Sequence, residues 1–274
     1  MQNKSRYLAG IAASLIVIAV ALWGPEWIAD RYDEKTMNRI NTETVKGAAG
    51  YCYSMNGNQK LYLLGQCLDS QKRPETELSA LTRVDADSTF GAMTGNYAFV
   101  ENRQDVSDEG IPETEVFRRC NEEIDTLKEL GILPKEVIAV EEDAYNAVLC
   151  SAIDVLEPRN NLAVWKISLS TDVKNADKTN RFLDIYMDAD TGNIYEFYVR
   201  TSREWENIDT ERMITQYEEY LGLTGRTAYE NPNPLLETTP DFQKYTFPGG
   251  DKGSVTVTIG FYEGIRELFL KVGN

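Results

Sequence analysis

Residues 181–200, RFLDIYMDADTGNIYEFYVR, predict a β-hairpin. On each side of a polar centre, apolar side chains occupy every second position, which is the period of a strand with one buried face. The centre, Asp188-Ala-Asp-Thr-Gly-Asn193, is rich in residues that favour turns. The preceding segment 163–170, AVWKISLS, alternates in the same way and predicts a third strand. The apolar faces of the three predicted strands are Trp165, Ile167 and Leu169; Leu183, Ile185 and Met187; and Tyr195, Phe197 and Val199.

Two amphipathic helices are predicted on either side of these strands. The first covers 112–130, where Pro112 suits the first turn and Gly131 ends the helix. The second begins at Asp209, whose carboxylate can cap it, and ends at Gly222. In both helices the apolar residues are three or four positions apart, so each helix buries one stripe. The stripes are Val116, Cys120, Ile124 and Leu127 in the first helix, and Met213, Ile214, Tyr217 and Leu221 in the second.

Shorter segments complete the predicted fold. Residues 97–100 look like one short strand, and 255–261 and 268–272 alternate on either side of a Glu263-Gly264 turn. Asn56-Gly57 is a favoured hairpin turn, and an apolar stretch, KLYLLGQCL, follows it. Residues 224–240 are expected to form a loop. The sequence therefore predicts an α+β fold with an antiparallel sheet and two packing helices, behind an N-terminal transmembrane helix.

Residues 7–25, YLAGIAASLIVIAVALWGP, contain no charge and predict a transmembrane signal-anchor. Nineteen helical residues span roughly 30 Å, which is the thickness of a bilayer's hydrocarbon core. Lys4 and Arg6 precede the span, whereas Glu26 and Asp30 follow it. The positive-inside rule then predicts a cytoplasmic N-terminus and an extracytoplasmic C-terminal domain.

A cleaved signal peptide is the alternative interpretation of this N-terminus. Ala19-Val20-Ala21 matches the small-x-small rule for cleavage, but it lies inside the apolar run and Leu22-Trp23 follows it directly. The anchor interpretation is therefore preferred. The predicted segments are a cytoplasmic tail at 1–6, the anchor at 7–25, a juxtamembrane stalk at 26–45, an α+β domain at 46–206, and a helix plus C-terminal hairpin at 207–274 packed on the same unit.

Composition excludes several classes of function. The 274 residues include no histidine, so histidine-based acid/base catalysis and imidazole metal sites are ruled out. Lysine and arginine number 28 against 44 aspartate and glutamate residues, which gives a formal net charge of −16. Phosphate neutralisation needs a basic surface, so nucleic acid is not an expected partner.

The hairpin centre contains Asp190-Thr191-Gly192, the tripeptide of aspartic proteases. Those enzymes need a second aspartate across a dyad, and the chain has no second copy of the tripeptide. The spacing of Asp188, Asp190, Gly192 and Asn193 also differs from a calcium loop, in which glycine is sixth and a glutamate twelfth. We therefore expect these four residues to form a turn in which water keeps the carboxylate pKa values ordinary. No catalytic, cofactor or metal residue is predicted.

The four cysteines are Cys52, Cys67, Cys120 and Cys150, and outside the membrane they allow three disulfide pairings. Cys52 and Cys67 flank the predicted hairpin at Asn56-Gly57, so a Cys52–Cys67 bridge is one of the possibilities. Cys120 and Cys150 lie in apolar stretches, where cysteine behaves as a small hydrophobic residue.

The segments AVWKISLS and RFLDIYMDADTGNIYEFYV together resemble the PepSY family of extracytoplasmic bacterial modules. In that family the strands end in a "vda-tG-i" turn, which residues 187–194 match. The resemblance covers 162–200 and implies a module joined to a membrane anchor or a protease proregion, which inhibits peptidases or modulates signalling. The link 171–180 is longer than in the family, and no alanine-rich helix directly precedes the first strand. The matched positions are alternation and a turn, so the resemblance transfers no functional residue.

These observations predict a non-catalytic, membrane-anchored module that binds and regulates another protein of a bacterial envelope. The bilayer, through residues 7–25, and an envelope peptidase or signalling sensor are the expected partners, and no cofactor is expected. Two alternatives stay open. One is an envelope hydrolase that uses Asp188 and Asp190 as a carboxylate pair, and the other is a structural component of an envelope or spore assembly.

Overall fold

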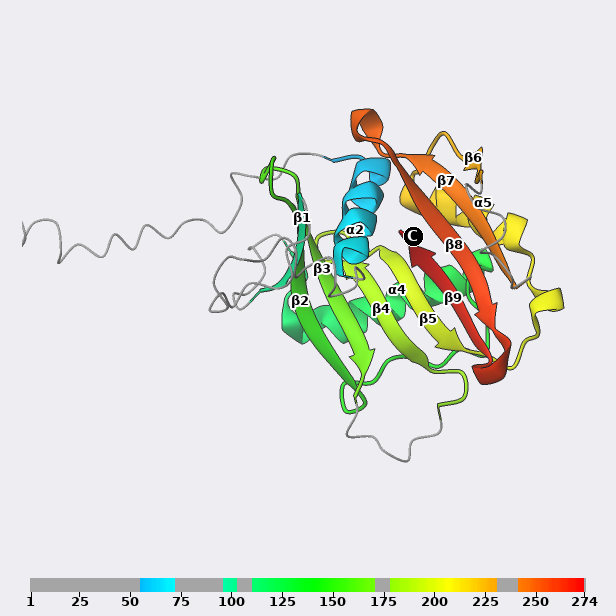
Figure 1. Ribbon diagram of the computed structural model, residues 1–274. Helices are drawn as coiled ribbons and strands as arrows, with labels where there is room; N and C mark the ends of the chain where they lie inside the picture. Colours follow the sequence, from blue (N-terminus) through cyan, green and yellow to red (C-terminus); the bar gives the residue numbers. More distant parts are fainter. Residues whose placement is uncertain (1–54, 72–95, 103–109, 171–177, 231–240, 274) are drawn as a thin grey trace, which may run out of the picture. The chain divides into compact units, whose positions relative to one another are not determined.

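In the part of the chain that the structure describes, a single antiparallel sheet of nine strands forms the centre of the fold (Figure 1). The computed structural model describes residues 55–71, 96–102, 110–170, 178–230 and 241–273, all of which belong to the second of the chain's two units, Gly47–Asn274. The strand order is β1-β2-β3-β4-β5-β9-β8-β7-β6. The strands are β1 (Tyr97–Glu101), β2 (Tyr145–Asp154), β3 (Asn161–Leu169), β4 (Phe182–Asp188), β5 (Ile194–Arg200), β6 (Thr227–Ala228), β7 (Phe242–Pro248), β8 (Ser254–Tyr262) and β9 (Glu267–Val272). The α-helices among the described residues are α2 (Gly57–Gln71), α4 (Val116–Leu130) and α5 (Thr210–Leu221). The prediction of an α+β fold with an antiparallel sheet is therefore confirmed for the described residues.

The order of elements repeats once along the chain. Helix α4 is followed by strands β2 to β5, and helix α5 is followed by β6 to β9. Within each group, strands that are consecutive in sequence pair with one another. The two groups join where β5 pairs with β9, with Phe197 opposite Leu270 and Val199 opposite Leu268. Residues 207–274 thus complete the sheet that the preceding residues begin.

The predicted hairpin at 181–200 is confirmed as β4 and β5. The two strands pair antiparallel, with Ile185 opposite Phe197, and a register shift lies between Tyr186 and Met187. The expected apolar face is buried, except that Leu183 is half-buried. The C-terminal hairpin is confirmed as β8 and β9, with Ile259 opposite Leu270.

Both predicted helices are confirmed with their end signals. A 3-10 turn, Glu113–Glu115, leads into α4, which ends at Gly131 in the left-handed conformation with φ of 78°. At the start of α5, the Asp209 carboxylate accepts a hydrogen bond from the Arg212 backbone N–H at 3.0 Å. The predicted stripes of both helices are buried and face the sheet.

The segment that follows Asn56-Gly57 is a helix, α2, so the hairpin prediction there is wrong. Asn56 and Gln59 form a capping box at the start of this helix. The Asn56 side chain accepts from the Gln59 backbone N–H at 2.9 Å, and the Asn56 backbone N–H donates to Gln59 Oε1 at 3.1 Å. Leu61, Leu64 and Leu68 have helical spacing and are buried. The asparagine therefore caps a helix here rather than forming a hairpin turn.

Helix α2 lies on one face of the sheet, opposite α4 and α5, where β5 and β9 separate (Figure 1). The two strands pair only over residues 197–200 of β5. Nearer the start of β5, the Val272 backbone N–H donates instead to the Glu196 carboxylate at 2.8 Å. A Cβ at Gly65 would come within 2.7 Å of Val255. Glycine at this position thus allows α2 to pack closely against β8.

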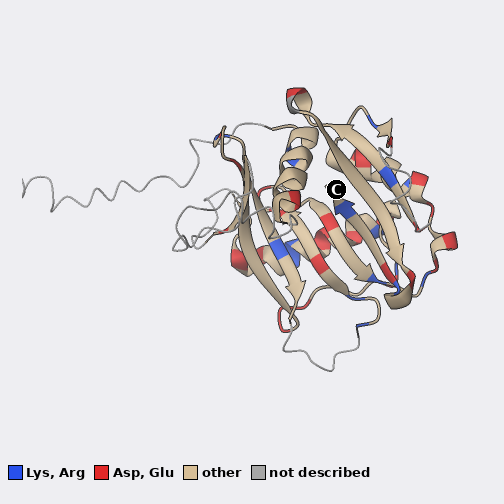
Figure 2. Ribbon diagram, viewed as in Figure 1, with Lys and Arg blue, Asp and Glu red and all other residues tan. Residues whose placement is uncertain are grey.

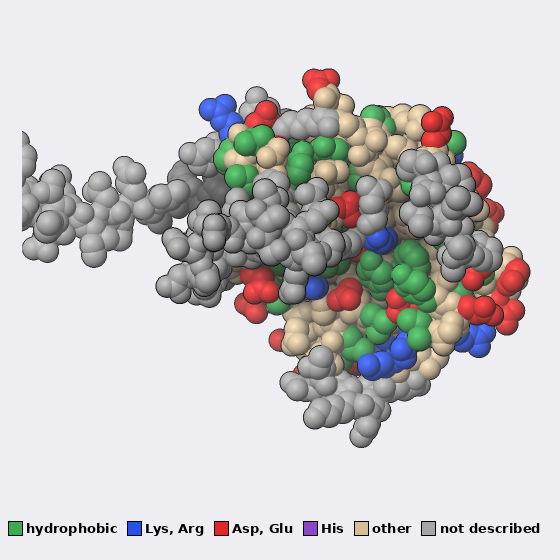
Figure 3. All heavy atoms as spheres, viewed as in Figure 1, with side chains coloured by type: hydrophobic (Ala, Val, Ile, Leu, Met, Phe, Trp, Pro, Cys, Tyr) green, Lys and Arg blue, Asp and Glu red, His purple; other side chains and the backbone are tan. Residues whose placement is uncertain are grey.

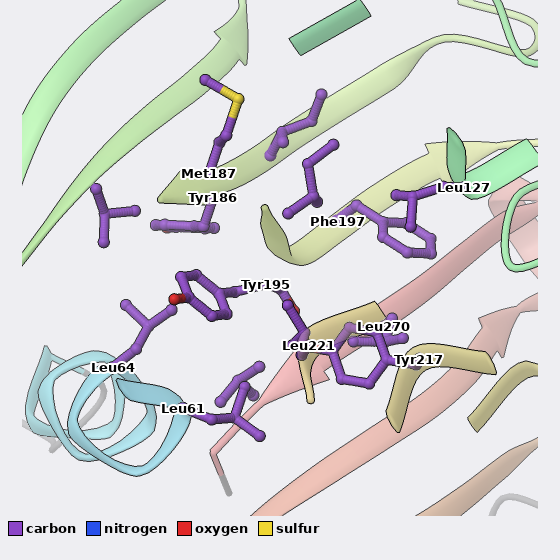
Figure 4. Close-up of a cluster of buried hydrophobic side chains, with 14 of the residues drawn as sticks. Leu61, Leu64, Leu127, Tyr186, Met187, Tyr195, Phe197, Tyr217, Leu221 and Leu270 are labelled. Atoms are coloured by element: carbon purple, nitrogen blue, oxygen red, sulfur yellow. The ribbon is translucent and has the colours of Figure 1, made fainter. Parts of the chain in front are cut away.

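The core continues from α2 to the helices on the opposite face. Figure 4 shows Leu61 and Leu64 of α2 lying toward Tyr195 of β5 and Leu221 of α5, beside Leu270 of β9. All five side chains belong to one buried cluster. Side chains of α2 therefore fill the space where β5 and β9, which join the two strand groups, do not pair.

Three strands were not predicted as strands. Strand β2 contains the apolar AVLCSAI run, whose small residues show no clear alternation, and β6 lies in the segment 224–240 that was expected to be a loop. Strand β7 pairs with β8 along its whole length, with Tyr245 opposite Val257. The predicted strand at 97–100 is confirmed as β1.

Candidate functional site

The segment Asp188–Asn193 forms the turn between β4 and β5, as predicted. Oδ1 of Asp188 accepts hydrogen bonds from the backbone N–H groups of Asp190 at 2.8 Å and Thr191 at 3.0 Å. The Asp188 backbone N–H donates to the Asn193 carbonyl at 2.8 Å, and Gly192 has a φ of 85°. The side chain of Asp188 thus organises the turn, and glycine meets its left-handed position.

The burial of Asp188 differs from the prediction that water surrounds this carboxylate. The side chain is 0 % exposed. Its Oδ2 accepts hydrogen bonds from Lys60 Nζ at 2.8 Å and from the Tyr195 hydroxyl at 2.6 Å. Burial by itself would raise the pKa of Asp188, but the charge of Lys60 and the hydrogen bonds to Oδ2 hold it below its usual value. The pKa of this carboxylate is therefore not ordinary.

The two carboxylates that the sequence pairs in an aspartic hydrolase have different surroundings. Asp190 is exposed, whereas both oxygens of Asp188 are occupied by hydrogen bonds from the protein. A carboxyl that acts as an acid or a base must reach a substrate proton. In this arrangement the Asp188 carboxylate joins α2 to the β4–β5 turn.

The other helices also contact this turn. The Tyr217 hydroxyl of α5 donates to the Tyr195 carbonyl at 2.6 Å, and the Tyr220 hydroxyl accepts from the Ile194 backbone N–H at 2.8 Å. From α4, Arg119 donates to the Thr191 carbonyl at 3.0 Å. Side chains of all three α-helices therefore converge on the turn and on the first residues of β5.

Sequence reasoning missed the residues that complete this cluster. Lys60 is 128 positions from Asp188 in the chain, so no local pattern predicts their ion pair. Tyr195 was assigned only to the apolar face of a strand. Burial, and then the Asp188 charge, raise the pKa of its phenol well above the usual value. An alternating strand pattern does not distinguish a tyrosine whose hydroxyl binds a buried carboxylate from one that only packs.

A row of aromatic rings lies on the face of the sheet opposite α4 and α5. Tyr198 of β5 stacks on Phe269 of β9 at 5.8 Å between ring centroids, and Tyr262 of β8 stacks on Phe269 at 4.8 Å. Gly260 makes this possible, because a Cβ there would lie 2.3 Å from the Phe269 ring. We call Tyr198, Phe269 and Tyr262 the aromatic strip. Tyr262 is 54 % exposed and, with nearby Ile265, presents apolar surface to solvent.

Charged side chains of both signs border the aromatic strip. Figure 2 shows acidic and basic positions on β5 and β9 and none along β8, and Figure 3 shows hydrophobic side chains gathered between the charged groups. Arg200 and Glu267 are opposite each other in the register of β5 and β9. Burial raises the pKa of Glu267, although the charge of Arg200 opposes this. An aromatic centre with a charged border is typical of protein interfaces.

Two hollows away from the aromatic strip and from the Asp188 turn are lined by acidic side chains. One of about 210 Å³ lies beside α2 and includes Tyr62, Tyr97 and Asp154 in its wall. Another of about 540 Å³ includes Trp205 and Phe261, together with four acidic side chains and Arg266. Both favour cationic over anionic ligands.

In the described part of the chain, no three cysteine, aspartate or glutamate residues are grouped closely enough to hold a metal ion. Cys67, Cys120 and Cys150 are free and buried. Burial raises the pKa of Cys67 to about 12 and that of Cys150 to about 11. Cys52 lies outside the described residues, and the hairpin that motivated a Cys52–Cys67 bridge is instead helix α2.

The predicted anchor at 7–25 and the stalk at 26–45 also lie outside the described residues. Among the helices that the structure describes, none has the length and apolar character needed to cross a bilayer. Comparison of the chain with models of protein families, with curated protein sequences and with solved structures found no match. The resemblance to the PepSY family stays a prediction.

Proposed function

We propose that this protein is a non-catalytic binding module and that the aromatic strip contacts its protein partner. The observation that carries the proposal is the stack of Tyr198, Phe269 and Tyr262 on the sheet face opposite α4 and α5, with Tyr262 54 % exposed. Tyrosine and phenylalanine are enriched at the centres of protein interfaces, because they bury a large area at a small cost in side-chain entropy.

The rigidity of the strip supports a role in recognition. Phe269 is only 7 % exposed and lies over Gly260, so its ring is held between Tyr198 and Tyr262. A side chain that is already ordered loses little conformational entropy when a partner binds. Because the chain carries a net charge of −16, we expect a partner segment with net positive charge around an apolar residue.

The surroundings of Asp188 favour binding over hydrolysis. The nominated catalytic pair does not converge on a hollow, since Asp188 is fully buried and hydrogen-bonded while Asp190 is exposed. The signal-anchor at 7–25 would place the domain outside the membrane. A partner in the envelope, a peptidase or a signalling sensor, is consistent with that location and with the resemblance to PepSY modules.

Site-specific photocrosslinking in cells tests this proposal. A photoreactive phenylalanine analogue replaces Tyr262 in the full-length chain, and Leu156 in a control. Leu156 is also apolar and is 71 % exposed, but it lies in the β2–β3 connection. We expect a discrete protein adduct from position 262 and not from 156. Equal adducts from both positions, or none from 262, would exclude the strip as the contact surface.

A further inference from the structure

A hollow of about 410 Å³ lies between the end of α4 and the start of α5. Its wall includes the loop at 131–135, the segment at 207–209 and Leu268 of β9. The apolar floor is well ordered by packing, because Ile132, Leu133 and Met213 are at most 2 % exposed. A volume of this size is within the range of small-molecule sites, roughly 300–1,000 Å³.

The charge of this hollow is opposite to that of the chain. Four cations, Lys128, Lys135, Arg203 and Arg212, line it, and two acids, Glu129 and Asp209, accompany them. The whole chain has 28 basic and 44 acidic side chains, so an excess of cations at one place is unexpected.

Two of the four cations are not paired with any acidic residue that the structure describes. Lys128 pairs with Asp125 at 3.1 Å, and Arg203 lies 3.8 Å from Glu136. Arg212 and Lys135 form no ion pair with any residue that the structure describes. Acidic side chains are abundant in the chain, yet none of the described ones pairs with Arg212 or Lys135. These two charges are therefore available to a ligand.

The position of Arg212 suits a ligand in the hollow. Its guanidinium lies beside Gly131, with Nη2 at 3.7 Å from where a Cβ of residue 131 would stand. Helix α4 ends at Gly131, so the negative end of its dipole lies there and attracts the Arg212 guanidinium. Asp209 is already engaged, because its carboxylate caps α5 through the Arg212 backbone N–H at 3.0 Å.

We infer that this hollow binds an oxyanion, a carboxylate or phosphate group carried by a small molecule, through Arg212 and Lys135. A guanidinium presents paired N–H donors that match two oxygens of either group, and an ammonium adds a point charge. The inference is independent of the aromatic strip, which lies on the opposite face of the sheet from α4 and α5.

Isothermal titration calorimetry of the full-length chain in detergent tests the inference at constant ionic strength. Pyrophosphate and citrate serve as separate probes for the phosphate and carboxylate classes. We expect one-to-one binding of at least one probe, and the tighter one identifies the class. Arg212→Gln and Lys135→Gln should each weaken binding by about tenfold or more, since each removes a charge-assisted contact.

Arg159→Gln is the matched control, because Arg159 is also exposed and without a described ion pair but lies in the β2–β3 connection. It should bind as the wild type does. All three positions are at the surface or only partly covered, so the melting curves should be unchanged. Absence of binding by both probes, or equal weakening by the control, would overturn the inference.

Discussion

The two ends of β5 differ in how their polar groups are satisfied. At the start of the strand, Ile194 and Tyr195 are tied to α5 by hydrogen bonds from Tyr217 and to Tyr220, and Tyr195 is tied to α2 through the Asp188–Lys60 ion pair. At the other end, Tyr198 joins a stack of rings that reaches solvent at Tyr262. The first end uses its polar groups to hold the fold together, and the second presents the aromatic surface that we propose contacts a partner.

The largest effect is expected from Asp188→Ala. Removing the carboxylate leaves the Lys60 ammonium and the Tyr195 hydroxyl without their shared acceptor at a site that is 0 % exposed. Breaking a buried pair in this way costs about 3–5 kcal/mol, and we expect about 3 because Lys60 is partly exposed. Urea unfolding followed by circular dichroism measures the change. A loss below about 1 kcal/mol would contradict the structural role of Asp188.

Acid should remove the same contribution in the wild type. The folded-state pKa of Asp188 lies below its ordinary value, so the carboxylate stabilises the fold fully above the unfolded pKa of about 3.9. That contribution is lost as the pH falls through the lower folded-state value. The difference in urea midpoint between wild type and Asp188→Asn should therefore be constant from about pH 7 to pH 5. It should shrink toward zero as the pH falls below about 4. If this difference in urea midpoint disappeared near neutral pH, a group other than Asp188 would control it.

A smaller effect is expected from Gly192→Val. Valine is strained at a φ of 85°, and its Cβ would lie 2.7 Å from the Arg119 side chain, which is flexible enough to move. We expect a loss of about 1 kcal/mol or somewhat more in the free energy of unfolding. Gly264→Val is a useful control, because a Cβ there meets nothing within 4 Å and Gly264 does not have positive φ. Equal losses in both variants would argue against a special conformation at Gly192.

The smallest effects on stability are expected at the exposed positions. Asp190→Asn should change the free energy of unfolding by less than about 0.5 kcal/mol, since surface substitutions seldom do more. Tyr262→Ser should cost about 0.5–1 kcal/mol, because it removes the ring stacked on Phe269. They should differ in binding, because only Tyr262 belongs to the aromatic strip. Thermal melts and partner capture on the same samples check both statements. Loss of the partner in Asp190→Asn would place the contact at the turn instead.

Much of the fold follows from local patterns in the sequence. The sequences of β4, β5, β8 and β9 alternate, although β8 and β9 are buried on both faces. Helices α4 and α5 combine an apolar stripe with glycine at their ends. Helix α2 was missed because Asn56-Gly57 fits both a hairpin turn and a helix cap. The glutamine at position 59, three residues after Asn56, is the signal that distinguishes them.

The candidate sites depend on contacts between distant parts of the chain. The turn at Asp188 could be predicted, but its burial could not, because Lys60, which pairs with Asp188, comes from a helix far away in sequence. The aromatic strip needs Gly260 beneath Phe269, a cross-strand contact that alternation alone does not reveal. Local periodicity predicts which residues share a face, and the pairing of strands decides which faces meet.

The central claim is that Asp188 acts on stability and Tyr262 on binding. Its most direct test is the amount of partner retained by Asp188→Asn and by Tyr262→Ser from detergent-solubilised membranes, per folded molecule. We predict that folded Asp188→Asn retains the partner at the wild-type level, whereas Tyr262→Ser loses about tenfold, as expected for an interface hot spot. Full retention by Tyr262→Ser, with loss of the partner by folded Asp188→Asn, would contradict the account.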